Sequence, residues 1–308
     1  RISRGREERQ MKKLLSFCLV CALTLSVSSH ASAIAPTDSS KLPASPSVYL
    51  DANEKIAFAA SIDQQVSRIK DEIKPLTASR DETVEYLLLE VPLATGDDRA
   101  QLISELESYG IYEFEGNVIE SAVPMSDSGD VDLTTPQVFY DSLTKEWTVT
   151  CGGSWKSREW VSERPVQGNV GGSDAFGVGY TYTNGDYNTL VVSASAALRT
   201  EDKQKYKLTD YRSDGDGSKG FGFRLQDEVI WNNGAYDYLG AKWSGSCTYD
   251  AKFISYSGIA TGYYIHTYNR AVIDNISFGF DGKHAGIDFS ISFPSESFDA
   301  FSSDKRFG

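Results

Sequence analysis

Residues 273–293, IDNISFGFDGKHAGIDFSISF, predict the fold class of this chain more clearly than any other stretch. From Ile287 to Phe293, isoleucine and phenylalanine alternate with aspartate and serine, and a step of two puts apolar side chains on one face of a β-strand. The apolar run Ile273–Phe280 precedes it, and the glycine-containing segment Asp281–Gly286 separates the two runs. We therefore predict an antiparallel hairpin with one buried face and one solvated face.

Two more hairpins are predicted from Asn-Gly pairs, because these residues supply the positive φ angles of a tight type I′ turn. The pairs are Asn184-Gly185 and Asn233-Gly234. Their flanking runs are Gly179–Thr183 with Tyr187–Val192, and Val229–Trp231 with Tyr236–Leu239. Residues 138–308 are rich in Tyr, Thr, Ser, Gly and β-branched residues throughout. The sequence predicts a mainly antiparallel β-sandwich or barrel-like domain over this range.

A small acidic helical region is predicted before it, over residues 51–120, which makes the fold class α+β. Ile62, Val66 and Ile69 recur at helical spacing, and Asp51 with Glu54 three residues later resembles a capping box. A second helix is predicted from about Asp97 to Tyr109, with Gly110 just beyond its end.

Two hypotheses remain for this helical region. It is either a prosegment that covers a surface of the β-rich domain, or a permanent part of one α+β protein. Residues 121–137 have the composition of a linker, and acidic residues outnumber basic ones more strongly before this segment than after it. A secreted species that begins near residues 120–137 would favour the prosegment.

The start of the chain predicts export. Residues 11–33 combine a basic start, an apolar stretch and small residues at the cleavage position, which is the pattern of a secretory signal peptide. Residues 1–10 are interpreted as an over-long start, and residues 34–50, rich in Pro and Ser, as a flexible leader. The apolar stretch is too short for a permanent membrane anchor. We expect a secreted, extracellular protein.

Cys151 and Cys247 are the cysteines that remain after the predicted cleavage. An oxidising compartment favours their pairing as a disulfide. A metal site or a nucleophilic thiol is the alternative, but two isolated cysteines lack the spacing of a metal-binding motif.

The charge of the chain predicts no nucleic-acid partner. The formal net charge is −13 at pH 7. A protein that binds a phosphate backbone needs a basic patch, and the sequence offers none. The expected partner is an unidentified extracellular or cell-surface molecule.

Candidate ligand-binding residues are Trp155, Trp160 and Trp231, since exposed aromatic side chains with a polar rim are a common binding surface. The alternative is that these tryptophans fill the core of the β-rich domain.

A weak calcium site is predicted from oxygen donors crowded into one glycine-rich loop, at Asp210, Asp214, Asp216 and Ser218. The loop lacks the glutamate of an EF-hand, and a solvated turn is the alternative. No other cofactor is predicted.

No catalytic residue is assigned. His266 and His284 are the histidines left after cleavage, and neither accompanies a nucleophile motif. We predict a secreted non-enzymatic binding or interaction protein. One alternative is an extracellular hydrolase with paired carboxylates, drawn from Glu146, Glu159, Glu163, Asp174 and Asp237. The other is a membrane-active, bacteriocin-like toxin that uses the apolar run Leu190–Leu198.

Overall fold

The computed structural model describes residues 47–119, 131–156, 168–184, 190–202, 206–208, 211–212, 217–232, 234–267, 272–280, 285–292 and 298–301. Ser40–Gly308 form one compact unit, to which all of the described residues belong. The predicted over-long start, the signal peptide and residues 34–46 of the predicted leader lie outside the described residues, as do residues 120–130 of the predicted linker.

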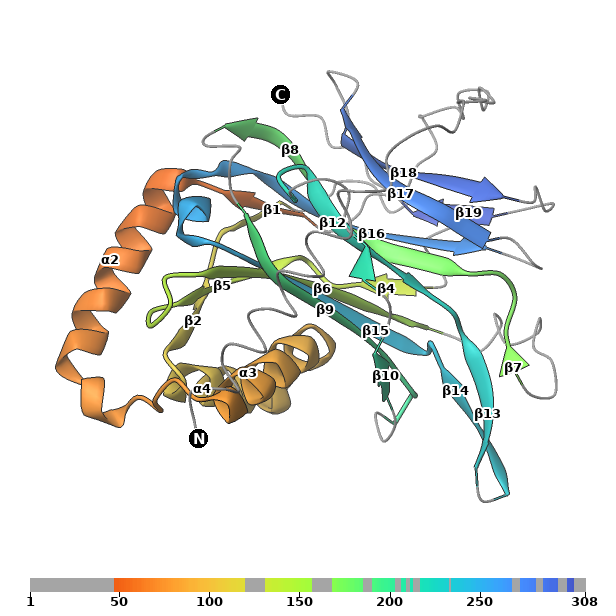
Figure 1. Ribbon diagram of the computed structural model, residues 1–308, viewed down its shortest axis with the longest axis horizontal. Coiled ribbons are helices and arrows are strands. Elements are labelled where there is room, and N and C mark those ends of the chain that lie inside the picture. Colours follow the sequence, from red (N-terminus) through yellow and green to blue (C-terminus); the bar gives the residue numbers. More distant parts are fainter. Residues whose placement is uncertain are drawn as a thin grey trace, which may run out of the picture. The chain divides into compact units, whose positions relative to one another are not determined.

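Two antiparallel sheets dominate this unit (Figure 1). Sheet A has the order β11 (Tyr211–Arg212), β12 (Gly220–Leu225), β8 (Asp174–Asn184), β16 (Ser257–Thr267), β1 (Ser47–Leu50) and β3 (Asn117–Ile119), with β19 (Phe298–Phe301) paired to β16. Sheet B has the order β10 (Tyr206–Leu208), β9 (Val191–Arg199), β15 (Lys242–Tyr249), β6 (Trp147–Trp155), β5 (Gln137–Asp141) and β2 (Ile111–Phe114), with β4 (Val131–Leu133) paired to β6. The predicted mainly antiparallel, β-rich architecture is confirmed. Within the described strands, neither sheet closes into a barrel.

One apolar core holds the inner faces of both sheets together. Trp147, Val149 and Cys151 alternate along β6 and are buried with Phe176 and Phe223 of sheet A. The same core takes up Trp243, Cys247 and Tyr249 from β15. Gly245, on β15, lets the sheets approach closely, because a Cβ atom there would lie 2.5 Å from the Phe223 ring. Alternate residues of both strands therefore point into the same core.

Both predicted helices are present. α2 (Ala52–Arg68) starts at Asp51, whose Oδ1 accepts hydrogen bonds from the backbone N–H groups of Asn53 and Glu54. α4 (Gly96–Ser108) ends just before Gly110, which has a φ of 80°. A further helix, α3 (Ala78–Glu90), lies between them. The described residues also include three short 3₁₀ helices, η2 (Lys70–Glu72), η3 (Val91–Leu93) and η6 (Ala251–Ser255).

The helices α3 and α4 cover the outer face of sheet B (Figure 1). Leu87 and Leu88 of α3 and Leu106 of α4 pack against Ile111 and Phe139 of that sheet. Two ion pairs fix the same layer to strands: a buried one between Glu90 and Arg199, and a partly buried one between Arg80 and Asp141. Both hypotheses for the helical region, a covering prosegment and a permanent part of one α+β protein, predict contacts of this kind, so both stay predictions.

The N-terminal part of the chain also contributes strands. Ser47–Leu50, which the sequence placed in a flexible leader, form β1, and its residues pair with β16 on one side and β3 on the other. Val48 and Leu50 are buried in the core. The leader prediction is wrong for these four residues, because a strand this short gives no periodic signal after a Pro- and Ser-rich stretch.

The predicted hairpins have different outcomes. Asn233-Gly234 does connect a hairpin, of β13 (Glu228–Asn232) and β14 (Ala235–Leu239), which forms a small sheet with β7 (Gly168–Asn169). The predicted C-terminal hairpin is also confirmed, as β17 (Val272–Phe280) pairs with β18 (Ala285–Ser292). The hairpin at Asn184-Gly185 is wrong: β8 belongs to sheet A and β9 to sheet B, so the chain crosses between the sheets there.

Candidate functional site

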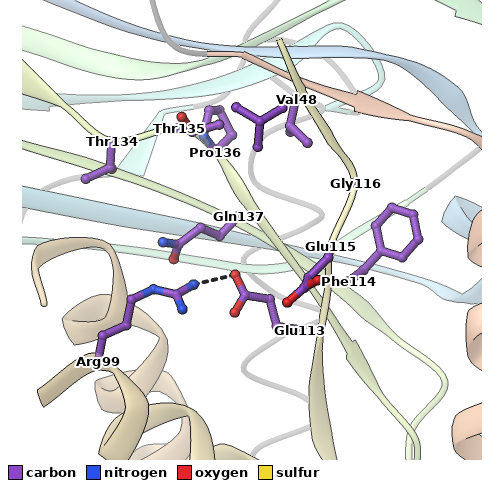
Figure 2. Close-up of a pocket in the computed structure, with 11 residues that line it drawn as sticks. Val48, Arg99, Glu113, Phe114, Glu115, Gly116, Thr134, Thr135, Pro136 and Gln137 are labelled. Carbon is purple, nitrogen blue, oxygen red and sulfur yellow. Dashed lines mark hydrogen bonds and ion pairs between the residues drawn. The ribbon is translucent and has the colours of Figure 1, made fainter. Parts of the chain in front are cut away.

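A cavity of about 470 Å³ opens where helix α4 meets both sheets (Figure 2). Arg99 reaches it from α4, Glu113 and Phe114 from β2, and Val48 from β1. The segment 134–137, which leads into β5, forms the remaining wall. The volume falls within the usual range for small-ligand sites, and the lining combines apolar groups with a few polar ones, as such sites do.

Charged groups of opposite sign face each other inside this cavity. The Arg99 guanidinium lies 2.5 Å from Oε1 of Glu113 (Figure 2). Burial raises the pKa of the Glu113 carboxyl; Arg99 offsets part of that rise, and the nearby Glu115 carboxylate adds to it. The cavity can therefore offer a hydrogen-bond donor, an acceptor and a carboxyl group that takes up a proton more readily than an exposed glutamate.

A pair of exposed aromatic side chains lies near the tip of the β13–β14 hairpin. Trp231 and Tyr236 are directly opposite in register, and their ring centroids are 4.6 Å apart at 65°. Trp231 is 52% exposed and Tyr236 is 43% exposed. On the same face, Val229 and Tyr238 are buried at the base of the hairpin. This face therefore passes from an anchored base to an aromatic surface open to solvent, and the hairpin itself extends away from the two large sheets (Figure 1).

The predicted set of binding tryptophans is only partly brought together. Trp155 is half-buried at the end of β6, and its ring packs edge-on against Tyr264 and His266, with centroids 5.9 Å and 5.1 Å away. It also contacts the apolar cluster at the base of the hairpin. Trp155 is thus a packing residue rather than a partner of Trp231 on an open surface. Trp160 lies outside the described residues.

A buried polar cluster occupies one end of the core. Asp174 begins β8, His266 lies near the end of β16, and Asp227 follows β12. Their exposed fractions are 0%, 2% and 1%, respectively, and each offers a potential ligand atom within 4.8 Å of the other two. His266 Nδ1 lies 2.9 Å from Oδ2 of Asp174, and Tyr264 Oη donates to the same oxygen at 2.6 Å.

The two cysteines are buried free thiols on neighbouring strands of sheet B. Cys151 is opposite Gly245 and Cys247 is opposite Val149, so the cysteines are diagonal neighbours rather than a direct pair. Diagonal positions lie roughly 7–8 Å apart, farther than a disulfide spans without a shift of the strands. Burial raises the pKa of both thiols, that of Cys247 to about 12, which does not favour a nucleophilic thiolate. The disulfide stays a prediction.

Three of the four predicted calcium ligands, Asp210, Asp214 and Asp216, lie outside the described residues. Ser218 is described, and its backbone carbonyl accepts a hydrogen bond from Tyr256 Oη. The calcium site therefore stays a prediction.

The residues of the alternative functions are dispersed. Glu159, Glu163 and His284 lie outside the described residues. Of the other proposed carboxylates, Asp174 is buried, whereas Glu146 and Asp237 are partly exposed. The apolar run of the toxin hypothesis forms β9, which pairs with β10 and β15 inside sheet B.

Sequence reasoning missed Tyr236, Asp227 and the cavity residues. Tyr236 could have been found, because a two-residue loop at Asn233-Gly234 places positions 231 and 236 opposite each other. Asp227 and the cavity residues carry no local signal, since they meet only through pairing between distant strands.

Among the described residues, no helix combines the length and the apolar character that crossing a membrane requires. Comparison of the chain with models of protein families, with curated proteins and with solved structures finds no match.

Proposed function

We propose that this chain is a secreted, non-enzymatic binding protein whose β13–β14 hairpin contacts a protein partner at the cell surface or in the surroundings. The observation that carries this proposal is the exposure of Trp231 and Tyr236 beside each other on a hairpin whose base is anchored in the core. The predicted signal peptide supports the extracellular setting.

The chemistry of this aromatic pair favours a protein partner. Tryptophan and tyrosine are the residues most enriched among those that dominate binding energy at protein interfaces. Each offers a large apolar surface with few rotatable bonds, so ordering it on binding costs little conformational entropy. The two rings meet at 65°, so they present one ring face and one ring edge rather than a flat platform for a sugar ring.

Binding of the fluorescently labelled protein to intact producing cells tests the proposal. We expect saturable binding that falls at least about tenfold in affinity in Trp231→Ala and in Tyr236→Ala. Tyr86→Ala is the matched control, because Tyr86 is an exposed aromatic residue on α3, far from the hairpin in sequence, and it should bind like the wild type. Protease treatment of the cells should abolish binding.

Three outcomes would contradict the proposal: no saturable binding, equal binding by the wild type and Trp231→Ala, or binding that survives protease treatment of the cells. Mass spectrometry of the culture medium tests export separately. The expected species begins at Ile34, after the predicted signal peptide.

A second candidate function is supported by the cavity of Figure 2. Burial raises the pKa of Glu113, which lies near the exposed Glu115 carboxylate, and two neighbouring carboxyl groups in different environments are the arrangement that glycoside hydrolysis uses. The ion pair of Glu113 with Arg99 weighs against it, because it favours the ionised form. Release of reducing ends from soluble polysaccharides by the wild type, lost in Glu113→Gln, would support this hydrolase.

A further inference from the structure

We propose that Asp174, Asp227 and His266 form a binding site for one divalent transition-metal ion of the zinc class. The site is separate from the exposed hairpin and from the cavity of Figure 2, and it stands whether or not the proposed partner binding is correct.

The strand order brings the three side chains together. β8 lies between β12 and β16 in sheet A, and its register pairs Ala175 with Ile265 and Asp174 with Leu225. The first residue of β8 therefore comes level with His266, and the turn after β12 supplies Asp227. One imidazole and two carboxylates converge at this end of the sheet, each with a potential ligand atom within 4.8 Å of the other two.

Hydrogen bonds hold the first ligand in place. Asp174 accepts from Tyr264 Oη at 2.6 Å and from the backbone N–H of Thr267 at 2.9 Å. Bonds of this kind orient a carboxylate and are the usual surroundings of metal ligands. Trp155, packed edge-on against His266, and Trp243, stacked on Tyr264 at 4.2 Å, cover the site on the side of sheet B.

The donor set indicates the metal. Zinc takes histidine nitrogen and carboxylate oxygen in sites with few ligands, whereas calcium takes six to eight oxygen ligands and magnesium retains several waters. Burial of all three side chains also brings two carboxylates into a region of low dielectric, where a divalent cation stabilises their ionised forms.

The position of the site indicates a structural role. Asp227 lies in the two-residue connection between β12 of sheet A and β13 of the aromatic hairpin. Gly240, at a φ of 109°, lies against its carboxylate; a Cβ atom there would be 2.7 Å from Oδ1. A metal held by Asp227, Asp174 and His266 would thus link the base of the hairpin to the two central strands of sheet A.

Cobalt(II) binding to the full-length exported protein tests the site. The protein is freed of metal with a chelator, and cobalt is added in excess calcium so that any calcium loop is filled. We expect visible absorption typical of a coordinated cobalt ion, saturation at one ion per chain and displacement by zinc. Zinc alone should raise the melting temperature. A folded protein that gives no cobalt absorption and no zinc-dependent stabilisation would overturn the proposal.

Variants separate this site from other ligands. Asp227→Asn and His266→Gln should each weaken cobalt binding at least about tenfold, while Asp237→Asn, on the neighbouring strand β14, should bind as the wild type. The double variant Cys151→Ala, Cys247→Ala should keep the absorption. Loss of the absorption in the cysteine variant, with retention in Asp227→Asn, would overturn the assignment. Circular dichroism checks that each variant is folded. If Asp227→Asn and His266→Gln both fail to fold, the wild type alone provides the test, through the rise of its melting temperature when zinc is added.

Discussion

Buried charges are arranged differently at two places in this molecule. Under the helical layer, a cation meets a carboxylate: Arg199 Nε lies 2.5 Å from Glu90 Oε1, and Arg80 lies 2.9 Å from Asp141. At the end of the core, His266 contacts Asp174, and a second carboxylate, Asp227, lies within 4.8 Å of both. The comparison shows that buried charged groups can have different roles. A pair of opposite charges holds a helix against a sheet, whereas two neighbouring carboxylates form the site that we propose a bound cation stabilises.

The largest expected effect comes from breaking the helical interface. Glu90→Gln should lower the free energy of unfolding by about 3–5 kcal/mol, because it leaves the buried Arg199 without its carboxylate. Lys145→Gln is the control, since the Lys145–Asp63 pair is half exposed, and it should cost under about 1 kcal/mol. Urea unfolding measures both. Equal losses in the two variants would mean that burial does not set the strength of these pairs.

A buried lysine on helix α2 extends the comparison. Lys55, on α2, donates to the backbone carbonyl of Phe253 at 2.6 Å and lies over the ring of the same residue. Burial lowers its pKa from 10.5 to about 7. The unfolded chain therefore binds a proton that the folded chain lacks above pH 7, and stability should rise by about 2–3 kcal/mol from pH 7 to pH 9. Urea unfolding at each pH should show a flatter profile for Lys55→Met.

Above pH 9 the two thiols reverse this trend. Burial raises the pKa values of Cys151 and Cys247 above the ordinary 9.0, so the folded chain keeps protons that the unfolded chain loses. Stability should then fall as the pH rises further. A disulfide removes the part of this fall that the thiols cause, whereas the part caused by the raised pKa values of the buried Tyr180, Tyr249 and Tyr264 stays the same. The same unfolding series on reduced and oxidised protein thus tests the predicted disulfide, and identical profiles would speak against it.

The smallest expected effect comes from the hydrogen bonds of the cluster. Tyr264→Phe should cost about 2 kcal/mol, because it removes a buried donor to the Asp174 carboxylate. Tyr140→Phe, which removes a donor to the more exposed Asp63, should cost under about 1 kcal/mol. A measurement that reversed this order would contradict the view that Asp174 is held in place as a ligand.

Local sequence patterns predicted the elements whose signals are local. The Asp51 cap and the isoleucine and valine stripe predicted α2, and Asn233-Gly234 predicted the hairpin that carries Trp231. The same dipeptide failed at Asn184-Gly185, because β8 finds its partners in β12 and β16. An Asn-Gly pair predicts that the chain turns, but it does not predict which sheet the next strand joins.

The buried cluster was beyond prediction for the same reason. In a single sequence, His266 is a histidine between tyrosines on a predicted strand, and no neighbouring residue indicates a metal-binding motif. Asp174 and Asp227 come level with it only after β8 has entered sheet A between β12 and β16. Chemistry that depends on the order of strands is visible only once that order is known.

Strand β1 has a consequence for when the protein can fold. Val48 pairs with Ala260. A segment that is synthesised early therefore pairs with one that is synthesised late. Pairing between positions so far apart in the chain slows folding, because a long loop must close before the contact forms. Until β16 is available, Val48 and Leu50 have no core to enter. In the export that we propose, this delay would keep the chain in the unfolded form that can pass through a narrow channel.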